Sequence, residues 1–326
     1  MTAAPTSRRA TVALKRFLPA VGLLILCLFF AIRVPQATGR QSFLTLDNAF
    51  TIAGQYAWLL LVGMGATVVI VAGGIDLSVG SVLALSGVTA AQLIVHPRTH
   101  WPVGAAMLGG IAIGALSSAL VGLVVTRLKV PAFIASLGVL LVARGIALRF
   151  AEGHTVSGLP DSFGVIASGR PLGIPVPLIL VVLAAGFVAF LLHYTKFGRY
   201  VYAIGSNAEA ARVSGIPVER VQVLAYTLGG ALAGLGGLVE AGRLSSGNPT
   251  SGTGYELDVV TAVVVGGASL AGGEGRVSGT ILGALLIAVL HNGASLLNID
   301  SFDQNIYIGL LIIGAVALDQ KLRRLK

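Results

Sequence analysis

Residues 103–126 read VGAAMLGGIAIGALSSALVGLVVT and contain no charged side chain. An α-helix needs about 20 residues to cross the hydrocarbon core of a bilayer, and this run is long enough. Comparable apolar runs recur along the 326 residues, of which 55% are hydrophobic and 11% are charged. The mean hydropathy is +0.90. A soluble domain of this length would need more polar surface, so the sequence predicts an all-α integral membrane protein.

About ten transmembrane helices are expected from the positions of these apolar runs. The expected spans are 17–33, 50–72, 78–95, 103–126, 133–150, 175–194, 221–242, 257–272, 277–297 and 303–320. Together they form one polytopic membrane domain over 17–320. An N-terminal tail, 1–16, precedes this domain, and a basic C-terminal tail, 321–326, follows it.

The basic residues are unevenly divided between the two sides of the predicted bundle. Lys and Arg accumulate in the cytoplasmic loops of inserted helices. With the N-terminus placed inside, most of the 22 Lys and Arg residues fall on the inner side. This asymmetry predicts an even number of spans and both termini in the cytoplasm. It also accounts for the net charge of +9, since the basic residues form no continuous stripe for nucleic acid.

Two connections between predicted spans are longer than the rest and lie on opposite sides of the membrane. The outer one, 151–174, is rich in Gly, Ser and Pro and is expected to form an irregular cap. The inner one is 195–220. Each is a candidate docking surface because it is the largest polar segment on its side.

Local sequence features predict a short helix within 195–220. Asn207 suits the N-cap position, and the segment 208–213 that follows favours helix, with Glu209 in its first turn. Gly215 and its preceding serine then end the helix. Taken alone, such a loop is by default an amphipathic interface helix without a partner.

Small residues recur every four positions on several predicted helices. These stripes are Gly110, Gly114, Ser118 and Gly122, then Gly230 and Gly234, and finally Gly279 and Gly283. Small faces let helices approach closely in lipid, where packing replaces the hydrophobic driving force. We therefore expect a compact helix bundle.

Two segments are similar in sequence: TVVIVAGGIDLSVGS (67–81) and TAVVVGGASLAGGEGRVSGT (261–280). Both run from a threonine through a Val-rich stretch to Gly-Gly and a polar break. Duplicated halves are common in transporters, so a possible internal duplication is one interpretation. The chemistry of helix hairpins alone is the other.

Catalytic sequence motifs are absent from the chain. It has no G-x-x-x-x-G-K-[ST] loop for nucleotide phosphates, no G-x-S-x-G nucleophile and no H-E-x-x-H zinc motif. The five His residues are scattered without the spacing of metal ligands. We therefore expect no enzyme activity, no metal site and no cofactor in this chain.

The segment GGIDLSVGS, 73–81, is the most unusual part of the sequence. Gly73 and Gly74 are expected to break a helix near the inner half of the membrane. Asp76 and Ser78 then stand where the next span begins. Non-helical backbone is tolerated at this depth only where protein buries it or where it lines a water-filled cavity. Two interpretations stay open: a cap for the next helix, or part of a polar pathway or gate.

Four further ionisable residues lie within or at the edge of predicted spans: Arg144, Glu240, Glu256 and Asp258. The three acids stand near the outer ends of their helices, where a solvated position beside the headgroups is expected. Arg144 lies deeper and needs a partner. Asp76, Glu240 or a backbone carbonyl are the candidates, and the sequence does not choose between them.

Five blocks of the sequence carry a family resemblance. They are GGIDLSVGS (73–81), VPAFIASLG with ARG (130–138, 143–145), GRPLGIPVP (169–177), FGRYVYAIGSNAEAARVSGI (197–216) and GRLSSGNPTSGTGYELDVVTAVVVGGASLAGGEGRVSGTILGAL (242–285). In the same order, they resemble the membrane permeases of bacterial monosaccharide importers of the ATP-binding-cassette (ABC) superfamily, and the ribose-transport permeases most closely. The resemblance extends from about residue 45 to residue 320.

The resemblance implies a function and a set of partners. Such a permease forms the pathway for a monosaccharide, ribose or a related sugar, across the inner membrane. It pairs with a second permease copy or a paralogue. ABC ATPase subunits, which bind ATP and Mg²⁺, lie below it, and a periplasmic or extracellular sugar-binding protein lies above it. The permease itself has no catalytic residues.

The resemblance also implies roles for residues at the matching positions. A cytoplasmic helix would dock on the ATPase through Ala203, Gly205, Ser206, Asn207, Glu209, Arg212, Ser214 and Gly215. The translocation pathway would be bordered by Gly73, Gly74, Asp76, Ser78 and Arg144, with Tyr255, Glu256 and Asp258 near its outer mouth.

An ion-coupled secondary transporter of a small polar solute is the alternative function. Such a transporter would need a titrating carboxylate near the midplane of the membrane, and Asp76 is the candidate. The sequence does not identify the sugar, because the protein that selects it is a separate chain.

Overall fold

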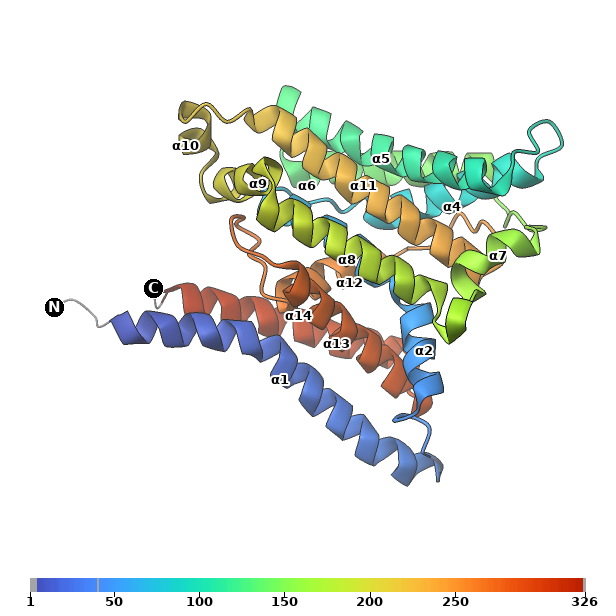
Figure 1. Cartoon of the computed structure of the whole chain (residues 1–326), viewed down its shortest axis with the longest axis horizontal. Helices are drawn as coiled ribbons and strands as arrows, with labels where there is room; N and C mark the ends of the chain where they lie inside the picture. Colours follow the sequence, from blue (N-terminus) through green and yellow to red (C-terminus); the bar gives the residue numbers. More distant parts are fainter. Residues whose placement is uncertain (1–4, 40, 325–326) are drawn as a thin grey trace.

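The computed structural model describes residues 5–39 and 41–324, and the side chains of 5–18, 311–312 and 315–324 lie outside what it describes. Within these residues the chain is helical almost throughout (Figure 1), with one isolated bridge between Val156 and Gly247. The helices are α1 (Pro5–Thr38), α2 (Leu46–Gln55), α3 (Ala57–Val71), α4 (Val79–Val95), α5 (Val103–Arg127), α6 (Ala132–Phe150), α7 (Asp161–Ser168), the 3₁₀ turn η1 (Pro171–Gly173), α8 (Val176–Tyr194), α9 (Lys196–Ser206), α10 (Ala208–Val213), α11 (Val218–Arg243), α12 (Tyr255–Val265), α13 (Val277–Leu296) and α14 (Ser301–Arg324).

Six helices in the described part of the chain are long and apolar enough to cross a bilayer. They are the Pro19–Thr38 part of α1, and α5, α6, α8, α11 and α13. The pair α2 and α3, bent by 52°, is a seventh candidate if it counts as one span. α4 is apolar but shorter. The expected all-helical, membrane-spanning fold is confirmed at this level.

The helix expected at 257–272 is shorter than the sequence predicts. α12 ends at Val265, and its 11 residues extend about 16 Å, roughly half of the hydrocarbon thickness. Gly267 has a φ of 91°, a left-handed conformation that ends helices. Residues 266–276 then form a non-helical segment ahead of α13.

The ends of the chain are described only in part. The last expected span, 303–320, lies within α14, but some of its side chains are outside the described residues. Of the expected tails, residues 1–4 and 325–326 are also outside them. The remainder of both tails continues α1 and α14 as helix.

α11 is the central helix of the bundle and packs against α3, α4 and α5. Every residue of α3 is buried. The predicted small-residue stripes form the contact between α5 and α11, because a Cβ added to Gly114 would lie 2.6 Å from the Gly230 carbonyl oxygen. Gly283 approaches the backbone of Ala262 in α12 in the same way. The close packing predicted from these stripes is confirmed.

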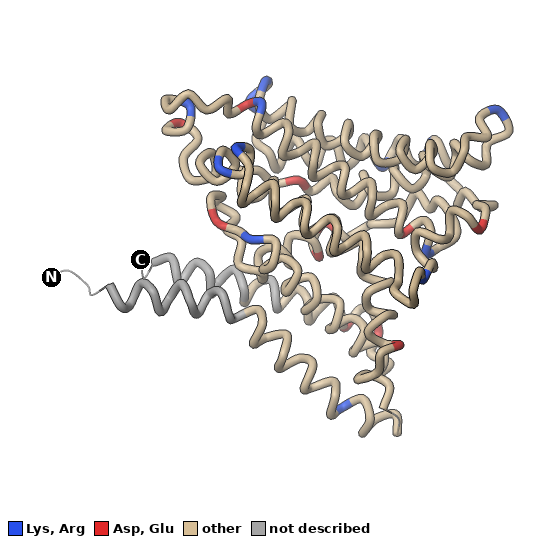
Figure 2. The backbone as a smooth tube through the Cα atoms, viewed as in Figure 1, with Lys and Arg blue, Asp and Glu red and all other residues tan. Residues whose placement is uncertain are grey.

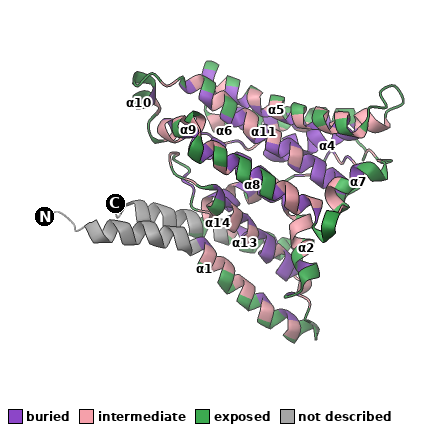
Figure 3. Cartoon of the chain, in the orientation of Figure 1, coloured by how far each residue is buried: buried purple, intermediate pink, exposed green. Residues whose placement is uncertain are grey.

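The two ends of the bundle differ in their elements. α9 and α10 lie at the end where α1 begins and α14 finishes, and α7 lies at the other end (Figure 1). Charged residues gather at the two ends and are sparse between them (Figure 2). Exposed residues lie on the outward faces of α5 and α8 (Figure 3). Apolar side chains among them are Leu116, Leu183 and Phe187. Such faces suit lipid as their solvent.

The outer connection, 151–174, is more regular than the sequence predicts. It contains the eight residues of α7 and the turn η1. Pro160 precedes α7 and Asp161 stands in its first turn, where both residue types favour a helix start. Phe163 is fully buried against α4 and α11. Burial of this ring holds the short helix on the bundle, which the polar composition of the loop did not reveal.

Candidate functional site

Asp76 is the central residue of the break between α3 and α4. Its side chain is 5% exposed. The carboxylate accepts hydrogen bonds from the backbone N–H of Ser78 (2.9 Å), the Ser78 hydroxyl (2.5 Å) and the Ser118 hydroxyl of α5 (2.9 Å). Asp76 therefore orders the turn that leads into α4, whereas Ser78, at the N-cap, forms no side-chain capping bond. A role of Asp76 in a pathway stays a prediction.

The break lies inside the bundle and α11 supports it. Ser118 precedes the end of α5 by about 14 Å of helix. The Tyr226 hydroxyl of α11 donates to the Ile75 carbonyl oxygen at 3.2 Å. A Cβ on Gly74 would lie 2.6 Å from that hydroxyl, and Gly73 has a φ of 81°. Non-helical backbone persists here because protein groups replace water as hydrogen-bond partners.

Arg144 finds its partners in the loop that follows α11. Its Nη1 donates to the carbonyl oxygens of Pro249 (2.5 Å) and Ser251 (2.7 Å). Of the partners that the sequence left open, a backbone carbonyl is the one observed. The Glu256 carboxylate attracts the guanidinium and packs against Gly80 of α4. Arg144 thus ties α6 to the loop that leads into α12.

Glu240 is buried, contrary to the solvated position that the sequence suggested. Its side chain is 3% exposed. The carboxylate accepts two hydrogen bonds from Arg243 (2.8 and 2.9 Å) and one from the Tyr255 hydroxyl (3.3 Å). A carboxylate can be buried when it is paired in this way. The spacing of three residues between Glu240 and Arg243 was the available sequence feature that could have predicted the pair.

Tyr255 and Asp258 line a cavity of about 640 Å³, here called the outer cavity. Its walls come from the junction of α2 and α3, the end of α11, and parts of α12, α13 and α14. Further polar and aromatic residues that line it are Gln55, Tyr56, Trp58, His291 and Asn305. Glu256 is not among the lining residues and packs instead toward α4. The three residues expected at the outer mouth therefore occupy two environments.

Sequence reasoning missed the other residues of the outer cavity. They come from elements far apart in the chain, and no local motif connects them. The sequence predicts no metal-ligand role for His291, because the residue lacks the spacing of a metal ligand. Among the described residues no group of His, Cys, Asp and Glu could hold a metal ion.

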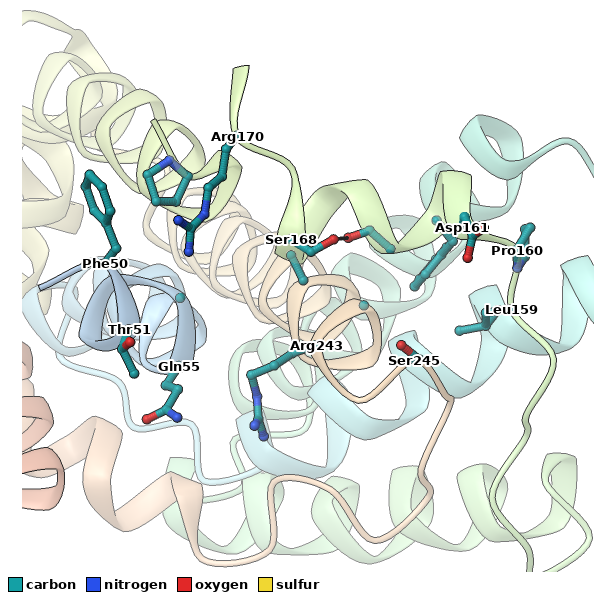
Figure 4. Close-up of a pocket in the computed structure, with 16 residues that line it drawn as sticks. Phe50, Thr51, Gln55, Leu159, Pro160, Asp161, Ser168, Arg170, Arg243 and Ser245 are labelled. Carbon is teal, nitrogen blue, oxygen red and sulfur yellow. Dashed lines mark hydrogen bonds between the residues drawn. The ribbon is translucent and has the colours of Figure 1, made fainter. Parts of the chain in front are cut away.

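A second cavity, of about 620 Å³, lies beneath α7 (Figure 4). Thr51 and Gln55 of α2 line one side of it, and Arg243 of α11 lines another. The Arg170 guanidinium lies 5.7 Å from the centre of the Phe50 ring, a cation–π contact. Gln55 and Arg243 line both cavities, so the two adjoin.

The short helix predicted in the inner connection is confirmed. α10 spans Ala208–Val213. The Asn207 side chain accepts a hydrogen bond from the Ala210 N–H at 2.9 Å, as an N-cap does. Ser214 follows the helix, and Gly215 has a φ of 80° that ends it.

Charged contacts fix α10 at the end of the bundle. Arg212 forms ion pairs with Glu209 (3.3 Å) and with Glu219 at the start of α11 (3.1 Å). Lys129, between α5 and α6, lies 3.8 Å from Glu219. Such exposed pairs contribute little stability but orient the helix. Glu209 and Val213 remain exposed on its surface.

α9 carries the rest of the expected coupling residues into the bundle, with Ala203 and Ser206 in its last turn. Gly205 lies directly against the Val71 carbonyl and the Gly273 N–H, which hydrogen-bond each other at 2.9 Å. The α9 helix therefore touches both the break after α3 and the segment after α12.

Tyr202 also holds α9 against the segment after α12. The Tyr202 hydroxyl of α9 donates to the Gly275 carbonyl oxygen at 2.8 Å. Burial raises the pKa of this hydroxyl above its ordinary value, so it keeps its proton and remains a donor. The expected coupling residues thus form two groups, one packed on the breaks through α9 and one exposed on α10.

Membrane-length helices that bury polar breaks and border two cavities are the architecture of an integral membrane protein. The chain belongs to the permease family described as branched-chain amino acid transport system / permease component, which matches residues 48–317. It is a multi-pass protein of the inner membrane.

Individual relatives agree with the resemblance seen in the five sequence blocks. Ribose import permease protein RbsC of Escherichia coli (strain K12) is 43% identical over 290 residues, 87% of this chain and 89% of the relative. RbsC of Bacillus subtilis (strain 168) is 44% identical over 305 residues, 93% of this chain and 92% of the relative. D-allose transport system permease protein AlsC of Escherichia coli (strain K12) is 36% identical over 280 residues, 86% and 85% of the two chains. No solved structure matches this chain.

Proposed function

We propose that this chain is the membrane permease subunit of an ABC importer and forms the pathway of a monosaccharide, ribose or a related sugar. The nearly full-length similarity to two ribose import permeases carries the proposal. A relative named for D-allose is also similar over most of its length. We therefore assign the tight selection of one sugar to a separate binding protein, and a weaker selection to the permease.

The end of the bundle with α9 and α10 faces the cytoplasm in this proposal. The basic residues Lys129 and Arg212 beside α10 support that orientation. Both termini are then cytoplasmic, because α1 begins and α14 finishes at this end (Figure 1). ATPase subunits with ATP and Mg²⁺ dock on α10. A periplasmic or extracellular sugar-binding protein docks near α7, and a second permease copy or a paralogue completes the pathway.

The residues proposed to border the pathway are Gly73, Gly74, Asp76, Ser78 and Arg144, with Tyr255, Glu256 and Asp258 toward the outer mouth. The buried polar contacts of Asp76 and Arg144 support this placement, since ionisable groups inside a membrane are costly and usually functional. A sugar is neutral, so its path needs hydrogen-bonding groups rather than strong charges. It must also be held weakly enough to leave.

An internal duplication and a count of ten spans belong to the same proposal. The segments 67–81 and 261–280 each run from a helix through a Gly-Gly break into the next helix. The Thr67 and Thr280 hydroxyls hydrogen-bond each other at 2.5 Å where the two segments meet. In this count α12 and its following segment 266–276 make a broken span.

ATP drives the cycle through α10. Closure of the ATPase subunits would favour one of two permease conformations, because α10 makes different contacts with the open and the closed ATPase. α9 then carries the displacement to the breaks beside Gly205. The chain contributes no covalent step.

Reconstitution tests the function. The chain is placed in liposomes with an ABC ATPase and a sugar-binding protein from the same organism, and uptake of D-ribose, D-allose and L-arabinose is measured. We expect ATP-dependent uptake of at least one sugar. Uptake by the chain alone on a pH gradient would instead support the alternative, an ion-coupled secondary transporter of a small polar solute with Asp76 as its carboxylate.

Docking on α10 is tested by co-purification. Replacing Glu209, Arg212 and Gly215 together with alanine should abolish co-purification of the ATPase and leave membrane insertion unchanged, because these residues form or shape the exposed helix. The matched control, Arg98→Ala with Glu152→Ala, removes exposed charges at the opposite end and should keep co-purification at the wild-type level. Wild-type co-purification by the triple variant would exclude α10 as the docking helix.

A further inference from the structure

We infer that the outer cavity is a weak monosaccharide-binding subsite of the permease, with Gln55 and Asn305 as its hydrogen-bonding residues and Tyr56 and Tyr255 as its aromatic walls. The inference rests on the proposed function and adds the location at which the sugar binds. At about 640 Å³, the cavity falls within the range of roughly 300–1,000 Å³ that small-molecule sites occupy.

Two stacked ring pairs make the walls rigid. Tyr255 lies on Trp58 with ring centres 3.7 Å apart and planes inclined by 10°. Tyr56 lies on the His291 ring at 5.9 Å and 12°. A hydrogen bond of 2.7 Å to Gln304 holds His291 in turn. Flat, fixed aromatic surfaces with a few polar groups suit a ligand that has both an apolar and a hydroxylated side, as a sugar ring has.

Two amides at the cavity are available for a ligand. In the described part of the chain, the side chains of Gln55 and Asn305 form no hydrogen bond and no ion pair with another residue. A carboxamide offers two donors and a carbonyl acceptor, and a sugar hydroxyl both donates and accepts. Because the two amides come from α2 and α14, they approach a bound ligand from different helices.

The charges at the cavity favour a neutral ligand. Arg243 is neutralised by its bidentate pair with the buried Glu240. The Asp258 carboxylate lies 3.9 Å from Nε2 of His291. Each basic side chain among the described lining residues therefore has an acidic partner. A phosphorylated sugar would bring its negative charge beside Asp258 and is disfavoured. The subsite therefore takes an unphosphorylated sugar.

The neighbouring cavity beneath α7 supplies a route to the subsite. Gln55 and Arg243 line both cavities, and Figure 4 shows the two side chains next to each other, extending in the same direction from α2 and α11. A sugar released at the outer end of the bundle would pass Gln55 before it reaches Tyr255. Gln55 is thus the first contact of the subsite.

Tryptophan fluorescence tests the subsite on the full-length chain in lipid nanodiscs. The chain has two tryptophans, and Trp101→Phe leaves Trp58, which is 4% exposed beneath Tyr255, as the only emitter. D-ribose, D-allose and L-arabinose are titrated, with D-ribose 5-phosphate as the charged comparison. We expect a saturable change in emission, in the millimolar range, for the sugar that the reconstituted importer takes up. The phosphate ester should give none.

Variants locate the response. In the Trp101→Phe background, Gln55→Ala or Asn305→Ala should raise the half-saturating concentration about tenfold, the size expected for loss of one hydrogen bond. Gln41→Ala removes an exposed amide between α1 and α2 and should leave it unchanged. Both test residues are exposed, so the variants should keep the wild-type circular dichroism and thermal midpoint.

The outcomes separate the subsite from the function. The subsite is excluded if the importer takes up a sugar that does not change the Trp58 emission. It is also excluded if the half-saturating concentration of that sugar is the same for all variants. In both cases the proposed function stands. If the assembled importer takes up none of the three sugars, the proposed function fails. A response of equal size to D-ribose 5-phosphate would also overturn the inference, because it contradicts the charge argument.

Discussion

Asp76 accepts three hydrogen bonds while it is almost wholly withdrawn from solvent. Asp76→Ala would leave the Ser78 N–H and two serine hydroxyls buried without an acceptor. We expect it to lower the stability of the chain by about 1–3 kcal/mol, the cost of unsatisfied buried donors. Asp76→Asn keeps a carbonyl acceptor and should cost less. Thermal unfolding in detergent, followed by circular dichroism, measures both.

The control for Asp76 is a carboxylate with the opposite environment. Asp303 is exposed in the first turn of α14, and Asp303→Ala should shift the thermal midpoint little. If Asp76→Ala unfolds at the wild-type temperature, the hydrogen bonds of the break do not stabilise the fold. Sugar uptake by a stable Asp76→Asn variant then separates the structural role of the carboxylate from a role in the pathway.

Helix contacts decide the fold at the scale of the elements, and α5 packs against α11 through glycine on both helices. A Cβ on Gly230 would overlap the Gly114 carbonyl and approach Ser118 to 2.6 Å. Gly230→Ala should therefore force the helices apart and destabilise the chain by about 1–3 kcal/mol, as overpacking does. Gly104→Ala, on the same α5 helix but facing open space, is the control. Equal thermal midpoints for the two variants would contradict the close approach.

The elements also show what the sequence alone could predict. Asn207, the helix 208–213 and Gly215 were predicted correctly because capping and helix termination depend on neighbouring residues. The glycine stripes were informative for the same reason. The burial of Phe163 in α7 depends on α4 and α11, so a composition rich in Gly, Ser and Pro could not reveal it.

At the scale of the whole molecule, contacts between segments far apart in the chain limit what the sequence can predict. The outer cavity brings Gln55, His291 and Asn305 together from three helices, and no spacing in the sequence connects them. The partner of Arg144 is a pair of backbone carbonyls, which have no sequence signature. Residues of the break were identifiable because Gly-Gly beside an acid is unusual within an apolar run. The geometry that holds the break was not.

The contact of α9 with both breaks leads to a prediction about coupling across the molecule. Gly205 lies against the Val71 carbonyl and Gly273, whereas α10 packs on α9 and α11. Gly205→Ala should push α9 away from the breaks and leave the α10 surface intact. ATPase co-purification should then stay at the wild-type level while ATP-dependent sugar uptake falls about tenfold, the effect of a coupling loss of ~1.4 kcal/mol.

Gly186→Ala in α8, where the added methyl group meets open space, should preserve both co-purification and uptake. Wild-type uptake by Gly205→Ala would mean that the contact transmits nothing. Loss of ATPase co-purification by the same variant would mean that α9 and α10 respond as one unit. This result would contradict the division of the coupling residues into a buried group on α9 and an exposed group on α10. If Gly205→Ala keeps ATPase co-purification but loses sugar uptake, the displacement of α10 must reach the two breaks through α9.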